Sequence, residues 1–161
     1  VTGQPYAEAV TGLVLAPLGL RESSFSDRPA HVPAGAVTGY ALTLDGEFKV
    51  LPARVPALQA VAGMWSTGAD LVRLGLGWSS LLPASLAHEA LTPQAEPASP
   101  GSGRTGLGWL LGPDNDTAMI AGGGLDATSY LAVRISDGRT RVVLTSRMIP
   151  VNTIADRLMT T

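Results

Sequence analysis

The chain has 161 residues, the size of one ordinary domain and enough to bury a sizeable core. Charged residues make up 15% of it and hydrophobic residues 45%, so the polar exterior is thin for a compact monomer. We therefore expect a partner that covers part of the surface, or a larger body of which this chain is one piece. The net charge of -2, with basic residues scattered along the chain, predicts no nucleic-acid partner.

Cysteine and long apolar runs are both missing from the sequence. Without cysteine there are no disulfides, no thiolate catalysis and no zinc-thiolate sites. The longest apolar run, 13–20, is short and contains Pro17, which predicts no membrane-spanning helix. No signal peptide is visible, and the opening on Val1 leads us to expect a cut or processed chain, so the compartment stays unknown.

The first expected element is a helix that begins at Pro5 and ends before Pro17. From 18 to about 62 the chain is rich in glycine, proline and small residues. Here we expect irregular structure with short strands or helices and a turn at Asp45-Gly46.

Two further helices are marked by capping residues. Thr67 is suited to cap the second helix, and Asp70 lies in its first turn. The apolar face of this helix holds Leu71, Leu74, Gly75 and Trp78. Ser85 is expected to cap a third helix that ends at Leu91, before Thr92-Pro93.

After 93–105, interpreted as a surface loop or linker, the pattern changes to that of strands. The expected strands cover 107–111, 117–121, 128–136 and 139–146, and we expect three or four of them to form an antiparallel sheet. A last helix, opened by Pro150 and with Val151, Ile154 and Leu158 on one stripe, is expected to cover that sheet.

The last hairpin has a predicted register. A two-residue turn at Asp137-Gly138 pairs Ser136 with Arg139. The pairs that follow are Val133 with Val142 and Leu131 with Leu144 on an apolar face, and Arg134 with Arg141 on the other.

Three consecutive glycines, Gly122, Gly123 and Gly124, end the second expected strand. Because glycine has no side chain, a substrate or another chain can approach this backbone closely. The pattern predicts a substrate-binding strand edge.

Several other patterns have simpler structural interpretations. GSGRTG at 101–106 matches a dinucleotide fingerprint, but a loop precedes it and a strand follows, so we interpret it as a turn. His31 and His88 are interpreted as surface or structural residues, and no metal site or cofactor is predicted. Ser66 is interpreted as a helix-entry residue. The acids interpreted as turn formers are Asp114, Asp116 and Asp126.

No activated nucleophile is present in this sequence. Activation of a serine by a lysine one helical turn later needs Ser-x-x-Lys. The single lysine, Lys49, has Gly46 three positions before it, and no Tyr-x-Asn occurs.

Five patterns, in order, resemble the serine β-lactamase-like family, which includes class C β-lactamases, D-alanyl-D-alanine carboxypeptidases and related esterases. They are VTGQPYAEAV with APLGLRESSF, Thr38-Gly39-Tyr40, AVAGMWSTGADLVRL, TGLGW at 105–109, and the glycine strand with its hairpin and terminal helix. The resemblance implies an α+β fold of the β-lactamase/transpeptidase type, incomplete relative to the family. We expect 1–95 to form part of a mostly helical subdomain and 96–161 to form the sheet strands and the C-terminal helix.

The resemblance also assigns a site. The third family motif, Lys/His-Thr/Ser/Gly-Gly, falls on Ala121, Gly122 and Gly123, and the N–H of Gly124 is expected to be an oxyanion donor. The motifs Ser-x-x-Lys and Tyr-x-Asn belong to a segment before Val1, so we expect no catalytic residue in this chain.

Three interpretations remain open. The favoured one is the C-terminal part of a serine hydrolase, esterase-like or penicillin-binding in type, inactive alone and completed by an N-terminal half or a second copy. The alternative is a non-catalytic binding module on the same scaffold. The third is an unrelated α+β domain. The family is often exported to the cell envelope, and in the complete enzyme the substrate would be a small acyl compound.

Overall fold

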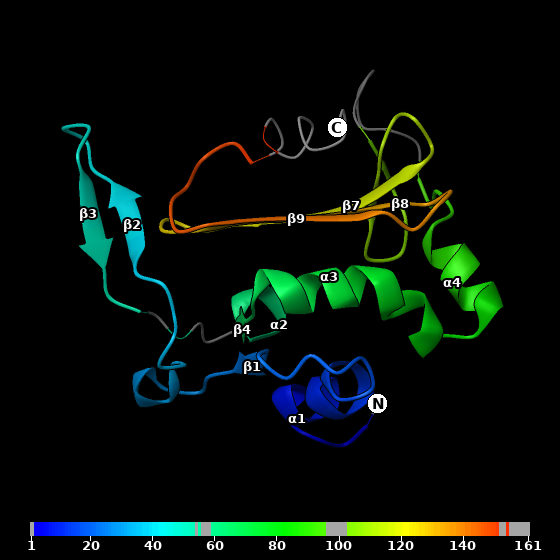
Figure 1. Ribbon diagram of the computed structural model, residues 1–161, viewed down its shortest axis with the longest axis horizontal. Helices are drawn as coiled ribbons and strands as arrows, with labels where there is room; N and C mark the ends of the chain where they lie inside the picture. Colours follow the sequence, from blue (N-terminus) through cyan, green and yellow to red (C-terminus); the bar gives the residue numbers. More distant parts are fainter. Residues whose placement is uncertain (1, 54, 56–58, 96–102, 152–153, 155–161) are drawn as a thin grey trace.

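In the computed structural model, residues 2–53, 55, 59–95, 103–151 and 154 are described. Figure 1 shows helix α3 (Gly68–Gly77) lying along one face of the sheet, with α1 (Tyr6–Val10) and β1 (Ser24–Phe25) on the far side of α3. The helix is therefore a middle layer. It packs against the sheet on one side and against the N-terminal segment on the other.

Five antiparallel strands form the main sheet within the described residues, one or two more than expected. In spatial order they are β5 (Arg104–Thr105), β6 (Leu110–Leu111), β7 (Thr117–Gly123), β8 (Thr128–Arg134) and β9 (Thr140–Thr145). The additional strand, β5, lies inside the glycine pattern interpreted as a turn, so that interpretation is wrong for 104–105.

The register of the last hairpin differs from the predicted one by two residues. Leu131 pairs with Val142, and Val133 pairs with Thr140. Four residues, 135–138, form the loop, and Arg134 N–H donates to Arg139 O at 2.8 Å. A slip of two keeps every side chain on its face, so the apolar face survives.

Asp116 explains this slip. Its backbone O accepts from the N–H of Ile135 at 2.7 Å, and its carboxylate accepts from the N–H and Oγ of Ser136 at 2.8 and 2.7 Å. The bond to Ile135 continues the β7–β8 ladder, and the two bonds to Ser136 hold that residue out of the β8–β9 ladder. The like charges of Arg134 and Arg141 therefore do not face each other, because Arg141 pairs with Ala132.

The core has two parts, one on each face of the sheet. Leu131 and Val133 of β8 pack with Trp109, Leu111 and other apolar residues on the face that α3 covers. On the opposite face, Tyr130 and Ala132 pack with Val151. The predicted C-terminal helix lies for the most part outside the described residues.

The N-terminal helix begins at Tyr6, one residue later than predicted. Pro5 is its N-cap, and α1 continues as a π-helical segment, η1 (Thr11–Leu15), that ends before Pro17. Beyond it, β1 pairs with β4 (Met64–Trp65), and a short 3-10 turn, η2 (Pro29–His31), follows β1 along the chain.

A hairpin of β2 (Gly39–Leu42) and β3 (Phe48–Leu51) stands at one end of the sheet (Figure 1). Its turn lies at the predicted position, with Gly46 at a φ of +84°. The base of the hairpin is held to the sheet, because Tyr40 N–H donates to Ser146 O at 2.9 Å.

The remaining helices are α2 (Gln59–Ala62), η3 (Trp78–Leu81) and α4 (Ala84–Ala90). Thr67 caps α3 as predicted, since its side chain accepts from Asp70 N–H at 3.2 Å. Ser85 does not cap α4, because that helix begins one residue earlier and Pro83 is its N-cap. The division at residue 95 stays a prediction. The described residues contain no helix long and apolar enough to cross a membrane.

Candidate functional site

Strand β7 is buried at its start and exposed at its glycine end. Thr117 and Ala118 are buried, whereas 120–124 are exposed. The neighbouring strand β6 reaches only as far as Met119, which pairs with Leu110. Beyond that pair, β7 has a free edge within the part of the chain that the structure describes.

The direction of the backbone groups along this edge follows from the ladder. Successive residues of an antiparallel strand point their N–H and C=O groups to opposite sides. Gly124 N–H donates to Ala127 O at 2.9 Å, which makes that pair hydrogen-bonded and turns Gly122 toward β8 as well. Ala121 and Gly123 therefore point their N–H and C=O groups to the free edge.

This geometry changes which group is available as a donor. The sequence assigned the oxyanion role to Gly124, but its N–H closes the β7–β8 turn. The outward N–H nearest to that position belongs to Gly123.

Close packing favours glycine at one position before the β7–β8 turn and at one position of β2. A Cβ on Gly122 would lie 2.9 Å from Ser129 Oγ, and a Cβ on Gly39 would lie 2.6 Å from Asp126 Oδ2. Asp126 lies in the turn, as predicted, and its side chain packs against the start of β2. The glycine edge and the β2–β3 hairpin are thus neighbours.

No base accompanies the glycine edge among the described residues. His31 Nδ1 lies 2.6 Å from Asp27 Oδ1 in an exposed pair, and His88 is exposed in the last turn of α4. Lys49 is exposed on β3, opposite Ala41. The hydroxyl of Ser129, on the neighbouring strand β8, donates to Gly122 O at 3.5 Å.

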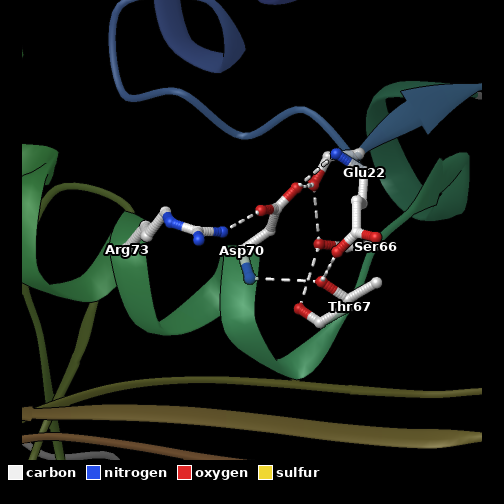
Figure 2. Close-up of polar contacts among 6 residues, drawn as sticks. Glu22, Ser66, Thr67, Asp70 and Arg73 are labelled. Carbon is white, nitrogen blue, oxygen red and sulfur yellow. Dashed lines mark hydrogen bonds and ion pairs between the residues drawn. The ribbon is translucent and has the colours of Figure 1, made fainter.

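A buried polar cluster at the start of α3 was missed by sequence reasoning. Asp70 is fully buried, and its carboxylate accepts from Glu22 N–H at 2.8 Å, Ser23 Oγ at 2.9 Å and Arg73 at 2.7 Å. Ser66 Oγ lies 2.8 Å from Ser23 Oγ, and Figure 2 shows Asp70 between Glu22 and Arg73. The cluster ties the N-terminal segment to the helix, so we assign it a structural role. The signal in the sequence was Ser-Thr-x-x-Asp.

Asp114 and Asp116 form turns, as predicted, at the opposite end of β7. Limited burial raises the pKa of the Asp114 carboxyl, but hydrogen bonds from Thr117 and from the Asp116 N–H hold it below its usual value of 3.8. These hydrogen bonds stabilise the loop between β6 and β7, so we assign Asp114 a structural role.

Comparisons with known proteins agree with the fold. The structure is similar to a penicillin-binding protein from Bacillus halodurans, with a TM-score of 0.82, 20% identity, and coverage of 99% of this chain and 50% of that one. It is similar to the D-amino acid amidase from Ochrobactrum anthropi, with a TM-score of 0.73, 23% identity, and coverage of 99% of this chain and 51% of that one. It is also similar to a class C beta-lactamase, with a TM-score of 0.75, 18% identity, and coverage of 99% of this chain and 52% of that one.

These likenesses establish a β-lactamase/transpeptidase-like fold. This chain spans about half the length of those solved structures. No curated protein matches significantly. The family model for Beta-lactamase, in contrast, matches residues 1–159. Because this match covers nearly the whole chain, the protein belongs to the Beta-lactamase family of serine hydrolases and their relatives.

Proposed function

We propose that this chain is the C-terminal portion of a serine hydrolase that transfers the acyl group of an ester or amide through a covalent acyl-enzyme. The observation that carries the proposal is the free, exposed glycine edge of β7, to which Ala121 and Gly123 turn their N–H groups. An edge of this kind can bind a carbonyl oxygen as it becomes negative, because its donors are fixed in place before the reaction.

In this proposal the attacking serine and its basic partners come from a segment outside the chain. The chain spans about half of the solved relatives, which leaves room for such a segment. The partner is a missing N-terminal half or a second copy of the chain. Alone, the chain supplies the glycine edge, at Ala121, Gly122, Gly123 and Gly124, and no catalytic residue.

The residue at position 121 narrows the class of substrate. It stands where the family motif has a lysine or histidine, so this edge offers no cation for a substrate carboxylate. We therefore favour an ester or neutral amide as the substrate over a carboxylated peptide.

Labelling with a fluorophosphonate separates the candidate functions. The isolated chain should neither be labelled nor hydrolyse a p-nitrophenyl ester or a chromogenic β-lactam. A longer natural polypeptide that contains it should be labelled at a serine before Val1. Labelling of the isolated chain would contradict the proposal, whereas an unlabelled longer polypeptide would favour the non-catalytic binding module.

Two substitutions of Gly123 test the donor in the active, longer polypeptide. Gly123→Pro removes the N–H, which points out of the ladder, and proline is tolerated at such edge positions. We expect kcat to fall by about 10²–10³, the usual cost of one oxyanion donor.

Gly123→Ala is the matched control. It keeps the N–H, and the added Cβ would lie 4.0 Å from its nearest neighbour, Ala127 O. Its kcat should stay close to that of the parent. Equal losses in the two variants would show that the N–H of Gly123 has no such role.

A further inference from the structure

An apolar pocket of about 160 Å³ lies where the β6–β7 ladder stops. Its lining residues come from β5, the turn before β6, β6 and β7, and none of them is charged. The lining residues are Thr105, Gly108, Trp109, Leu110, Met119, Ile120 and Ala121. Ala121 belongs both to this pocket and to the free edge, so the two features are continuous.

A tight turn creates the pocket. Gly106 N–H donates to Trp109 O at 2.8 Å, and Gly108 has a φ of +77°, so the chain before β6 bends away from β7. The bend ends the ladder at the Leu110–Met119 pair and leaves a gap beside Ala121.

One wall of the pocket is a buried tryptophan, and another is formed by exposed aliphatic side chains. Trp109 is buried and packs on Trp78 of η3, which directly follows α3, with ring centroids 5.0 Å apart. Leu110 and Ile120 remain 45% and 44% exposed, which is high for large apolar side chains in paired strands. A fixed aromatic wall with exposed aliphatic neighbours is suited to a group that arrives from solvent.

We propose that this pocket receives an apolar side chain of the acyl substrate, either an aromatic ring or a branched alkyl group, while the substrate backbone lies along Ala121 and Gly123. This inference rests on the proposed function and adds the substrate class. A strand that is added to a sheet edge gains affinity from backbone bonds and specificity from pockets for its side chains. The volume matches that of a cavity of about 150 Å³ that binds benzene.

The pocket predicts a preference among neutral esters. In the longer polypeptide, the p-nitrophenyl ester of phenylacetate should have a higher kcat/KM than that of acetate, by about fourfold for each buried methylene equivalent. Leu110→Asp places a carboxylate in the pocket and should lower this ratio at least about tenfold, a loss of about 1.4 kcal/mol. Leu107→Asp is the matched control, because Leu107 lies on the same hairpin, is 51% exposed and does not line the pocket.

Binding without turnover gives a second measurement. In the longer polypeptide, saturable quenching of tryptophan fluorescence by 1-(4-nitrophenyl)propan-2-one, a ketone with no bond to hydrolyse, should weaken at least about tenfold in Leu110→Asp and stay unchanged in Leu107→Asp. If esters are hydrolysed but neither the ratio nor the quenching separates the two variants, the pocket is not the subsite and the proposed function stands. If the quenching separates them while no ester is hydrolysed, the pocket stands and the proposed hydrolase does not.

Discussion

Asp70 is the most deeply buried charged residue that the structure describes. Its carboxylate serves the Glu22 N–H, the Ser23 hydroxyl and the Arg73 guanidinium, and these three partners come from two distant segments of the chain. A single side chain thus joins the N-terminal layer to α3. This polar role was hidden in the sequence, where Asp70 reads only as a first-turn acid.

The substitution Asp70→Ala should therefore lower the free energy of unfolding by about 2–4 kcal/mol. It removes the acceptor of the half-buried Glu22 N–H and of the buried Ser23 hydroxyl. Arg73→Ala should cost less than about 1 kcal/mol, since the Arg73 side chain is 55% exposed. Urea unfolding of both variants measures the difference. Equal losses would mean that the ion pair within α3, rather than the hydrogen bonds to Glu22 and Ser23, accounts for the stability that Asp70 supplies.

Asp114 makes a prediction about acid. Its folded-state pKa lies below 3.8 because hydrogen bonds from Thr117 and Asp116 outweigh the effect of limited burial, so its charge favours the folded state. That stabilisation is present above the unfolded pKa and is lost as the pH falls through the lowered folded pKa. Asp114→Asn should be less stable than the parent at pH 7, and the gap should narrow below pH 3.8. Urea midpoints across this range test it, and a gap independent of pH would contradict it.

Among the helices, α3 lies close to the sheet because Gly75 has no side chain at the point of contact. A Cβ on Gly75 would overlap the methyl group of Thr140 on β9, whereas a Cβ on Gly68 would meet nothing within 4 Å. Two glycines of the same helix thus have opposite roles. One permits contact with the sheet, and the other only lowers helix propensity.

Alanine substitutions in the same helix make this contrast measurable. Gly75→Ala should destabilise the protein by about 1–3 kcal/mol through overpacking against β9. Gly68→Ala should stabilise it by up to about 1 kcal/mol, because alanine is the better helix former. Thermal unfolding of the two variants would contradict this picture if both shifted in the same direction.

At the scale of the whole molecule, the sheet has two outer edges within the described residues. β5 lies at one edge and β9 at the other, and β7 adds its own free glycine end. Alternate residues of β9 hydrogen-bond to β8, beginning with Arg139 and continuing with Arg141 and Val143. The residues between them, Thr140, Val142 and Leu144, therefore point their N–H and C=O groups away from β8. An unpaired edge in a chain with few charges favours association with another strand.

We therefore expect the isolated chain to self-associate with increasing concentration. Leu144→Lys places a charge on the β9 edge and should shift the chain toward monomer. Leu82→Lys is the control, because Leu82 is similarly exposed, 40% against 43%, but lies outside the strands. Light scattering during size exclusion measures both. Association that is unchanged by Leu144→Lys would exclude this edge as the contact.

Elements that depend on local chemistry could be predicted from the sequence alone. Three of them follow from neighbours along the chain: Thr67 as a cap, Asp45-Gly46 as a turn, and the strand before the glycines. The ordered family patterns also identified the fold, which the match over 1–159 confirms.

Features that depend on distant partners became visible only in the folded chain. The Asp116 carboxylate holds Ser136, twenty residues away, out of the β8–β9 ladder. Asp70 acquired its role from Glu22 and Ser23, more than forty residues away. A hydrogen bond contributes its free energy only when both partners are brought together, so sequence spacing shows a candidate donor or acceptor without showing its partner.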